Sequence, residues 1–180
     1  KKLKDDITRL FQEQWEEPEL PAMEYRSATR LADWLAGHGF AVERQAGGLP
    51  TAFVARCGSG SGPVLALLAE FDALPGITQD AMPRRTLLPD KSSGHACGHH
   101  LLGAASVSAA IALRDWLERS GQPGTIRLYG TPAEEGGDGK VYMVRAGLFD
   151  DVDTVIHWHP ASVNSADSAS TLANRSAKFT

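Results

Sequence analysis

The residues of this chain that could do chemistry gather in its second half. Five of the six histidines in the 180-residue sequence lie between positions 95 and 159. Within residues 94–100, one glycine separates Cys97 from His99, which allows a tight turn and lets both side chains face one ion. A thiolate and an imidazole favour a borderline divalent metal such as zinc. We therefore predict Cys97 and His99 as metal ligands, and we expect the dipole of the following helix to favour the Cys97 thiolate.

Two adjacent glutamates, Glu134 and Glu135, supply carboxylates that such a site could use. In an extended segment, adjacent side chains point to opposite sides, so both cannot bind one metal. One glutamate is then expected to bind the metal while the other handles a proton. A divalent metal lowers the pKa of a coordinated water toward neutrality, and a nearby carboxylate can take its proton. The pair therefore predicts a metal-dependent hydrolytic site.

Three apolar runs predict the strands that would bring these residues together. The runs cover residues 64–69, 125–130 and 152–158. Polar residues follow or end each run: Glu70 and Asp72 the first, the two glutamates the second, and His157 and His159 the third. Ligands of open α/β sheets bind beyond the carboxyl ends of the strands. We expect all of these side chains to meet at one edge of a sheet.

The remaining pattern predicts the fold class. Apolar residues recur with helical spacing in four segments and alternate as in a strand in two others. The helical segments are 2–16, 23–36, 101–117 and 136–146, and the alternating segments are 40–45 and 51–56. Residues 73–94 show no convincing period, and a loop of this length in a compact domain is usually functional. The order of elements predicts an α/β fold, a three-layer sandwich with a mixed central sheet.

Composition narrows the class of partner. Hydrophobic residues make up 42% and charged residues 22%, with a net charge of -4, so neither a basic patch for nucleic acid nor an apolar run of membrane-spanning length is present. The first residues lack the pattern of a signal peptide. Two cysteines, Cys57 and Cys97, cannot form a disulfide framework. A cytoplasmic protein with a small-molecule substrate is expected, without nucleic acid or membrane as partner.

Each candidate residue also has an ordinary structural interpretation. A single histidine at a strand end is usually a packed structural residue, and a single buried cysteine is usually inert. Glu134 and Glu135 could begin a helix, and Asp72 could cap a turn. Four such coincidences at one sheet edge are much less probable than one site. Two rival sites stay open: Cys97 as a nucleophile paired with a histidine, and a metal-binding module without turnover.

Four segments resemble the amidohydrolase branch of the aminoacylase/carboxypeptidase metallopeptidases. They are residues 69–75 (Ala-Glu-Phe-Asp-Ala-Leu-Pro), 94–99 (Gly-His-Ala-Cys-Gly-His), 130–137 (Gly-Thr-Pro-Ala-Glu-Glu-Gly-Gly) and 158–160 (Trp-His-Pro). They occur in the order typical of the family, and the likeness is greatest to hydrolases of the aminobenzoyl-glutamate type. The resemblance implies a zinc-exopeptidase-like catalytic domain. It also implies hydrolysis of an amide bond in N-acyl or N-aroyl amino acids or dipeptide-like substrates.

The resemblance also implies a role for each candidate residue. Cys97 would bridge two divalent metal ions, Mn²⁺ or Zn²⁺, with His99, Glu135 and His159 as the other ligands. The spacing from Glu135 favours His159 over His157.

The resemblance implies two further roles near the metals. Glu134 would be the general base that activates a metal-bridging water, and Asp72 would orient a ligand. Glu70 stands where other branches place a metal-binding histidine. Two positions depart from the family pattern. His100 could compete for metal or simply pack, and Asp138 adds charge near the site entrance.

The resemblance further implies a domain organisation. Proteins of this family are much longer, and they insert a dimerising lid domain before the chain returns to supply a last metal-binding histidine. We therefore expect residues 1–170 to be the N-terminal part of the catalytic domain and residues 171–180 to begin the lid. The full-length protein would be a homodimer through that lid. The 180 residues alone are expected to have little or no activity.

Overall fold

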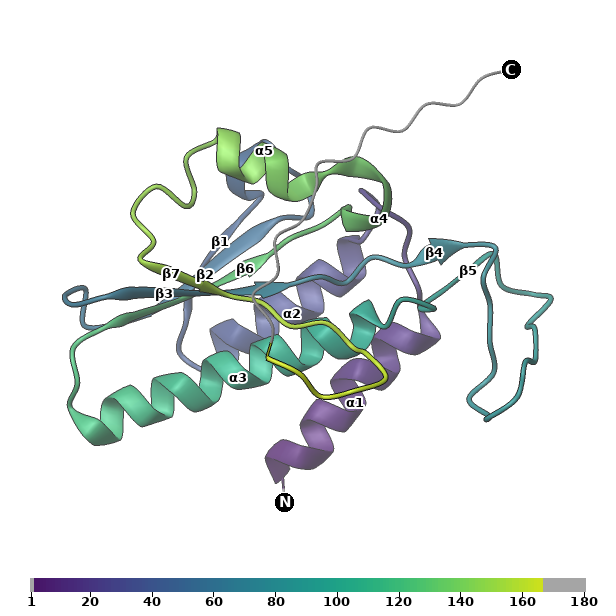
Figure 1. Ribbon diagram of the computed structural model, residues 1–180, viewed down its shortest axis with the longest axis horizontal. Coiled ribbons are helices and arrows are strands. Elements are labelled where there is room, and N and C mark those ends of the chain that lie inside the picture. Colours follow the sequence, from purple (N-terminus) through teal and green to yellow (C-terminus); the bar gives the residue numbers. More distant parts are fainter. Residues whose placement is uncertain (1, 167–180) are drawn as a thin grey trace.

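The computed structural model describes residues 2–166, with the side chains from residue 4 onward, and contains five α-helices, a 3-10 turn and seven strands in that range (Figure 1). The helices are α1 (Lys2–Glu16), α2 (Tyr25–Gly37), α3 (His99–Ser120), α4 (Glu134–Gly137) and α5 (Gly139–Arg145). The strands are β1 (Ala41–Arg44), β2 (Phe53–Gly58), β3 (Val64–Ala69), β4 (Leu74–Pro75), β5 (Ser93–Gly94), β6 (Thr125–Gly130) and β7 (Thr154–Ile156). The expectations for residues 171–180 lie outside the described part.

Five strands form a mixed sheet in the order β1-β2-β6-β3-β7. β1 runs antiparallel to β2 and β2 antiparallel to β6, whereas β6, β3 and β7 are parallel to one another. The parallel register pairs Ala69 at the end of β3 with Gly130 at the end of β6. The carboxyl ends of the three parallel strands therefore lie at the same edge of the sheet.

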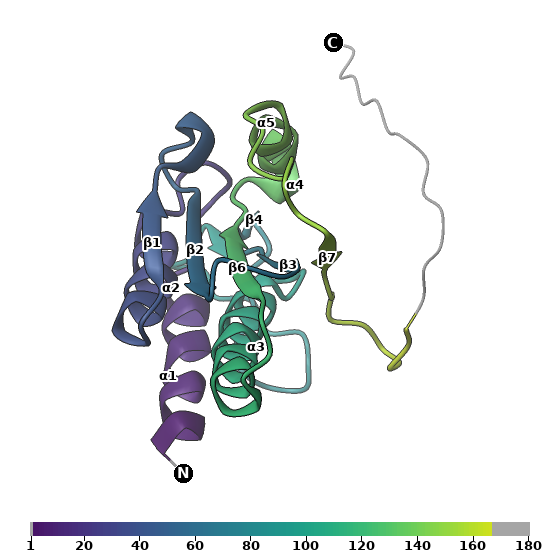
Figure 2. The ribbon, with the colours of Figure 1, turned by 90° about the vertical axis from the view of Figure 1, so that its left-hand side faces the viewer.

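Helices cover both faces of this sheet, as the three-layer prediction requires. α1, α2 and α3 lie on one face, and α4 and α5 lie on the other (Figure 2). Alternate residues of β2 separate the two cores, since Phe53 packs toward α2 and α3 while Val54 packs with Met143 of α5. This alternation is the period of a strand whose two faces are both covered. The predicted fold class is confirmed.

Two of the differences between predicted and observed helix bounds affect the site. α3 begins at His99, two residues before the expected start, so His99 and His100 lie in its first turn. The helix expected over residues 136–146 is two helices, because Asp138 between them has a φ of 51°. A left-handed residue cannot continue a right-handed helix. The short α4 therefore carries both glutamates and is separate from α5.

The strand expected over residues 152–158 is shorter and more exposed than predicted. β7 covers only Thr154–Ile156, and the side chains of Val155 and Ile156 are nearly half exposed. Among the described strands β7 pairs with β3 alone, so it forms an edge of the sheet. An edge position explains why an apolar sequence did not give a buried strand. Residues 157–160 leave the sheet and turn toward α3 (Figure 1).

The predicted loop over residues 73–94 contains only the short strands β4 and β5, which pair with each other. None of the helices in residues 2–166 is both long enough and apolar enough to cross a membrane.

Candidate metal centre

His99 is the centre of the cluster at the carboxyl edge of the sheet. Its side chain is 1% exposed, and its Nδ1 lies 2.9 Å from Oδ1 of Asp72. Its Nε2 lies 3.1 Å from Oε2 of Glu70 and 3.9 Å from a carboxylate oxygen of both Glu134 and Glu135. The segments that follow β3 and β6 thus meet the first turn of α3 at one imidazole. The expected convergence of strand ends is present in the structure.

Asp72 holds two of these elements together. One of its oxygens contacts His99 Nδ1, and the other accepts a hydrogen bond of 2.8 Å from the backbone N–H of Glu135. Its side chain is fully buried. A buried carboxylate on Nδ1 fixes that nitrogen as the protonated one, which leaves Nε2 to face the glutamates.

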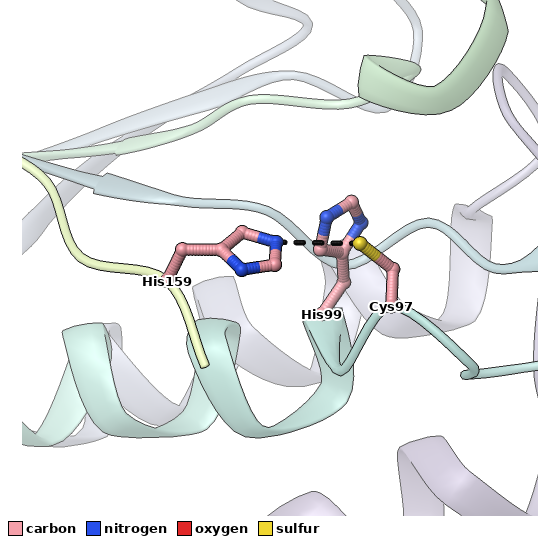
Figure 3. Close-up of side chains that lie close together, drawn as sticks. All are labelled: Cys97, His99 and His159. Carbon is pink, nitrogen blue, oxygen red and sulfur yellow. Dashed lines mark hydrogen bonds between the residues drawn. The ribbon is translucent and has the colours of Figure 1, made fainter. Parts of the chain in front are cut away.

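Cys97 and His159 lie beside His99 in the same cluster. Sγ of Cys97 lies 3.3 Å from Nε2 of His159, and the imidazoles of His99 and His159 meet edge to face (Figure 3). Cys97 precedes α3, and His159 comes from the segment after β7. Gly98 between Cys97 and His99 has a φ of 91°, and a Cβ there would lie 3.0 Å from the Pro160 ring. The glycine therefore permits the close approach of these two segments.

The two glutamates are arranged differently from the sequence-based expectation. They lie in the helical turn α4 rather than in an extended segment, and both carboxylates are equally distant from His99 Nε2. The Glu134 side chain is 42% exposed, whereas that of Glu135 is 17% exposed. Oε1 of Glu135 is buried and accepts no hydrogen bond within residues 2–166. The two glutamates therefore differ in how exposed their side chains are, and not in which way these side chains point.

The carboxylates control the charge of the cluster. Burial alone would lower the pKa of His99, but Asp72 and Glu70 outweigh it and raise the pKa to about 10. Burial and the charge of Glu135 raise the pKa of the Cys97 thiol to about 12. Burial and the nearby carboxylates therefore oppose the Cys97 thiolate that the helix dipole was expected to favour. Burial and the charge of Glu70 raise the pKa of Glu134.

The donor atoms fit divalent metals. Two groups of three side chains have their ligand atoms within 4.8 Å of one another, namely Cys97–His99–His159 and Glu70–His99–Glu134. Nε2 of His99 is buried and makes no hydrogen bond to any described residue. A buried imidazole nitrogen without a hydrogen bond, surrounded by sulfur, nitrogen and oxygen donors, is suited to zinc or manganese.

The other histidines near the cluster have different neighbours. His100 is buried against the Trp15 ring, with centroids 5.0 Å apart. His157 Nε2 lies 3.2 Å from Oε1 of Glu70, whereas His159 contacts Cys97. Asp138 is exposed and separates α4 from α5.

Two residues that support the cluster were missed in the sequence. Lys140 of α5 donates to Oε1 of Glu70. Glu24, fully buried before α2, accepts a hydrogen bond of 2.8 Å from the backbone N–H of Ala133, next to Glu134. Both contacts join segments far apart in the sequence, so periodicity and motif spacing carry no signal for them.

A mixed α/β sheet with thiol, imidazole and carboxylate donors at its carboxyl edge defines a class of metal-dependent hydrolases. The chain belongs to peptidase family M20/M25/M40, whose family model matches residues 66–171.

Relatives and solved structures agree with this family. The chain is 48% identical over 166 residues to a subunit of the p-aminobenzoyl-glutamate hydrolase of Escherichia coli, covering 92% of this chain and 34% of that protein. It is 34% identical over 143 residues to N-acetyl-L-cysteine deacetylase of Bacillus subtilis, covering 79% of this chain and 33% of the relative. A crystal structure of a dinuclear metal binding peptidase of the M20 family from Bacillus subtilis matches with a TM-score of 0.73 at 27% identity, over 85% of this chain and 42% of that one. The chain spans about a third of the length of these curated relatives.

Proposed function

We propose that the full-length protein is a metal-dependent amidohydrolase that cleaves the amide bond of N-acyl or N-aroyl amino acids, or of dipeptide-like substrates. The observation that carries the proposal is the buried Nε2 of His99, which faces three carboxylates and makes no hydrogen bond within the described residues. Aminobenzoyl-glutamate is the first substrate to test, because the Escherichia coli relative is named for its hydrolysis.

The proposed ligands are Cys97, His99, Glu135 and His159, and they would hold two Mn²⁺ or Zn²⁺ ions. Sulfur donors favour zinc, whereas carboxylate oxygens suit manganese. When bound, the metals polarise the scissile carbonyl and lower the pKa of the attacking water. Glu135 suits the role of ligand because its Oε1 is buried beside His99 and accepts no hydrogen bond from the part of the chain described.

Glu134 is proposed as the general base. Its carboxylate is the more exposed of the two and can face both the cluster and an incoming substrate. It would take a proton from the attacking water and pass it to the leaving amine nitrogen. Asp72 acts through His99, whose Nδ1–H it accepts, and keeps Nε2 free to bind metal.

Thiol catalysis is the second candidate, because Cys97 Sγ lies 3.3 Å from His159 Nε2. Burial and the surrounding carboxylates oppose it, since together they raise the pKa of the thiol to about 12. Chelation separates the two functions. We expect EDTA to abolish hydrolysis of aminobenzoyl-glutamate by the full-length protein, and Mn²⁺ or Zn²⁺ to restore it. Full activity in the chelator would refute the metal-dependent function.

The proposal also covers the cellular compartment and the oligomeric state of the protein. Both cysteines are free, which supports a reducing, cytoplasmic setting. We propose that residues 1–170 belong to the catalytic domain and that residues 171–180 lead into a lid through which the protein forms homodimers. The Escherichia coli relative is named as one subunit of its enzyme, which suggests a second kind of partner instead. Light scattering of the purified full-length protein distinguishes a homodimer from a monomer that awaits a different subunit.

A further inference from the structure

Glu70 is a buried carboxylate whose two oxygens have different partners. Its side chain is 4% exposed. Oε1 accepts from Lys140 Nζ and lies 3.2 Å from His157 Nε2. Oε2 lies 3.1 Å from Nε2 of His99, the nitrogen proposed to bind metal. One oxygen is thus fixed by two cationic or proton-donating groups, and the other is directed at the metal centre.

Glu70 and His99 make a close ion-pair contact whose geometry falls short of an aligned hydrogen bond. Nε2 has no hydrogen-bond partner among residues 2–166, although Glu70 Oε2 lies 3.1 Å away. Two ligand atoms about 2.1 Å from one ion, at angles between octahedral and tetrahedral, lie about 3.0–3.4 Å apart. The separation of these two atoms therefore fits two ligands on one metal.

We infer that Glu70 supplies an oxygen ligand, through Oε2, to the metal held by His99, and that Lys140 is the positioning residue that fixes this oxygen. The inference rests on the proposed metal-dependent function. The geometry also favours Glu134 over Glu70 as the free base, since Glu134 is the more exposed and makes no ion pair with a lysine among the described residues. An additional carboxylate oxygen would shift the preference of this position toward Mn²⁺.

Charge and ligation can be separated experimentally. Glu70→Gln removes both a ligand and a negative charge, and it leaves Lys140 without its partner. The double change Glu70→Gln with Lys140→Met removes one charge of each sign, so the net charge of the site stays constant. Lys140→Met alone keeps the ligand and removes its support. Glu43→Gln is the control, because Glu43 is exposed and pairs with Arg56 far from the site.

Titration of the metal-free full-length protein with Mn²⁺ and with Zn²⁺ is the measurement. We expect the double variant to lose at least ten-fold in affinity at one of two metal positions, and Glu43→Gln to match the unaltered protein. Lys140→Met should keep both metals but change the absorption spectrum of the Co²⁺-loaded protein. If Glu70→Gln alone does not fold, the double variant, which buries no unpaired charge, carries the test.

Unchanged affinity and metal count in the double variant would overturn the ligand role of Glu70. An unchanged Co²⁺ spectrum in Lys140→Met would overturn the positioning role of Lys140. Cys97→Ala, measured in parallel, separates this inference from the proposed function. If Cys97→Ala loses metal while the double variant binds it normally, the ligand role of Glu70 is rejected and the metal centre is kept. Normal binding in Cys97→Ala as well rejects the metal centre itself.

Discussion

At the scale of single residues, Asp72 connects two candidate ligands. Its two oxygens accept from His99 Nδ1 and from the backbone N–H of Glu135. In Asp72→Asn one of these positions becomes an amide nitrogen, which cannot accept. We expect metal affinity to fall about 10- to 100-fold, as for other residues that orient metal ligands. Metal titration measures this, with Asp33→Asn, an exposed aspartate paired with Arg44, as the control. Equal affinities in the two variants would contradict the role of Asp72.

His100 gives the metal-free protein a defined pH dependence. Burial and the charge of His99 lower the pKa of His100 to about 4, below its ordinary value of 6.5. The unfolded state therefore binds the proton first, and stability falls as the pH drops from 6.5 toward 4. Between pH 7 and pH 5 this histidine should cost about 2 kcal/mol. His100→Leu should remove that part of the loss in urea unfolding experiments. The same loss in both proteins would show that His100 has no such shift.

Residue types and spacing predicted which side chains gather, but not how they divide their roles. Cys97, His99, Glu135 and His159 were expected together because they follow or precede predicted strands and helices. The raised pKa of Cys97 was not foreseen, because it depends on burial and on carboxylates from two distant segments. Lys140 was missed because its partner Glu70 is 70 residues away.

At the scale of elements, the start of α3 fixes the distance between Cys97 and His159. Gly98 has a φ of 91°, and a Cβ there would contact Pro160 at 3.0 Å. Gly98→Ala should therefore strain the backbone by about 1–2 kcal/mol and displace the segment that carries His159. We expect weaker metal binding together with a lower melting temperature.

Gly60→Ala provides the matched control for Gly98→Ala. Gly60 also has a positive φ, of 72°, but a Cβ there would have no atom of a described residue within 4 Å. Its replacement should lower the melting temperature through backbone strain and leave metal affinity unchanged. If both variants bind metal equally well, the contact between Gly98 and Pro160 does not position the site.

Element types could be predicted from periodicity, whereas the boundaries of α4 could not. Asp138 and Ala133 adopt left-handed conformations, with φ of 51° and 55°, that isolate α4 as one short turn. No local pattern around a non-glycine residue announces such a conformation, because tertiary contacts maintain it. Ala133 is held by Glu24, which is more than a hundred residues away.

At the scale of the whole molecule, the order of the sheet explains why the site forms at all. Three parallel strands, β6, β3 and β7, end at one edge, and α3 lies below the sheet (Figure 1). The first turn of α3 carries His99 to that edge. The sequence predicted this convergence because apolar runs ended in polar residues. It did not predict the exposure of β7, since an apolar strand has the same sequence pattern at an edge as in the interior.

The central claim is a metal centre that uses Glu134 as its base, and one experiment on the full-length protein addresses it most directly. Metal content and aminobenzoyl-glutamate hydrolysis are measured on the same preparation of Glu134→Gln. We predict two bound metal ions per chain, as in the unaltered protein, and a loss of turnover of about 10²- to 10⁴-fold. Unchanged turnover with both metals bound would contradict the role of Glu134, and an unaltered protein that binds metal without any turnover would identify a binding module instead.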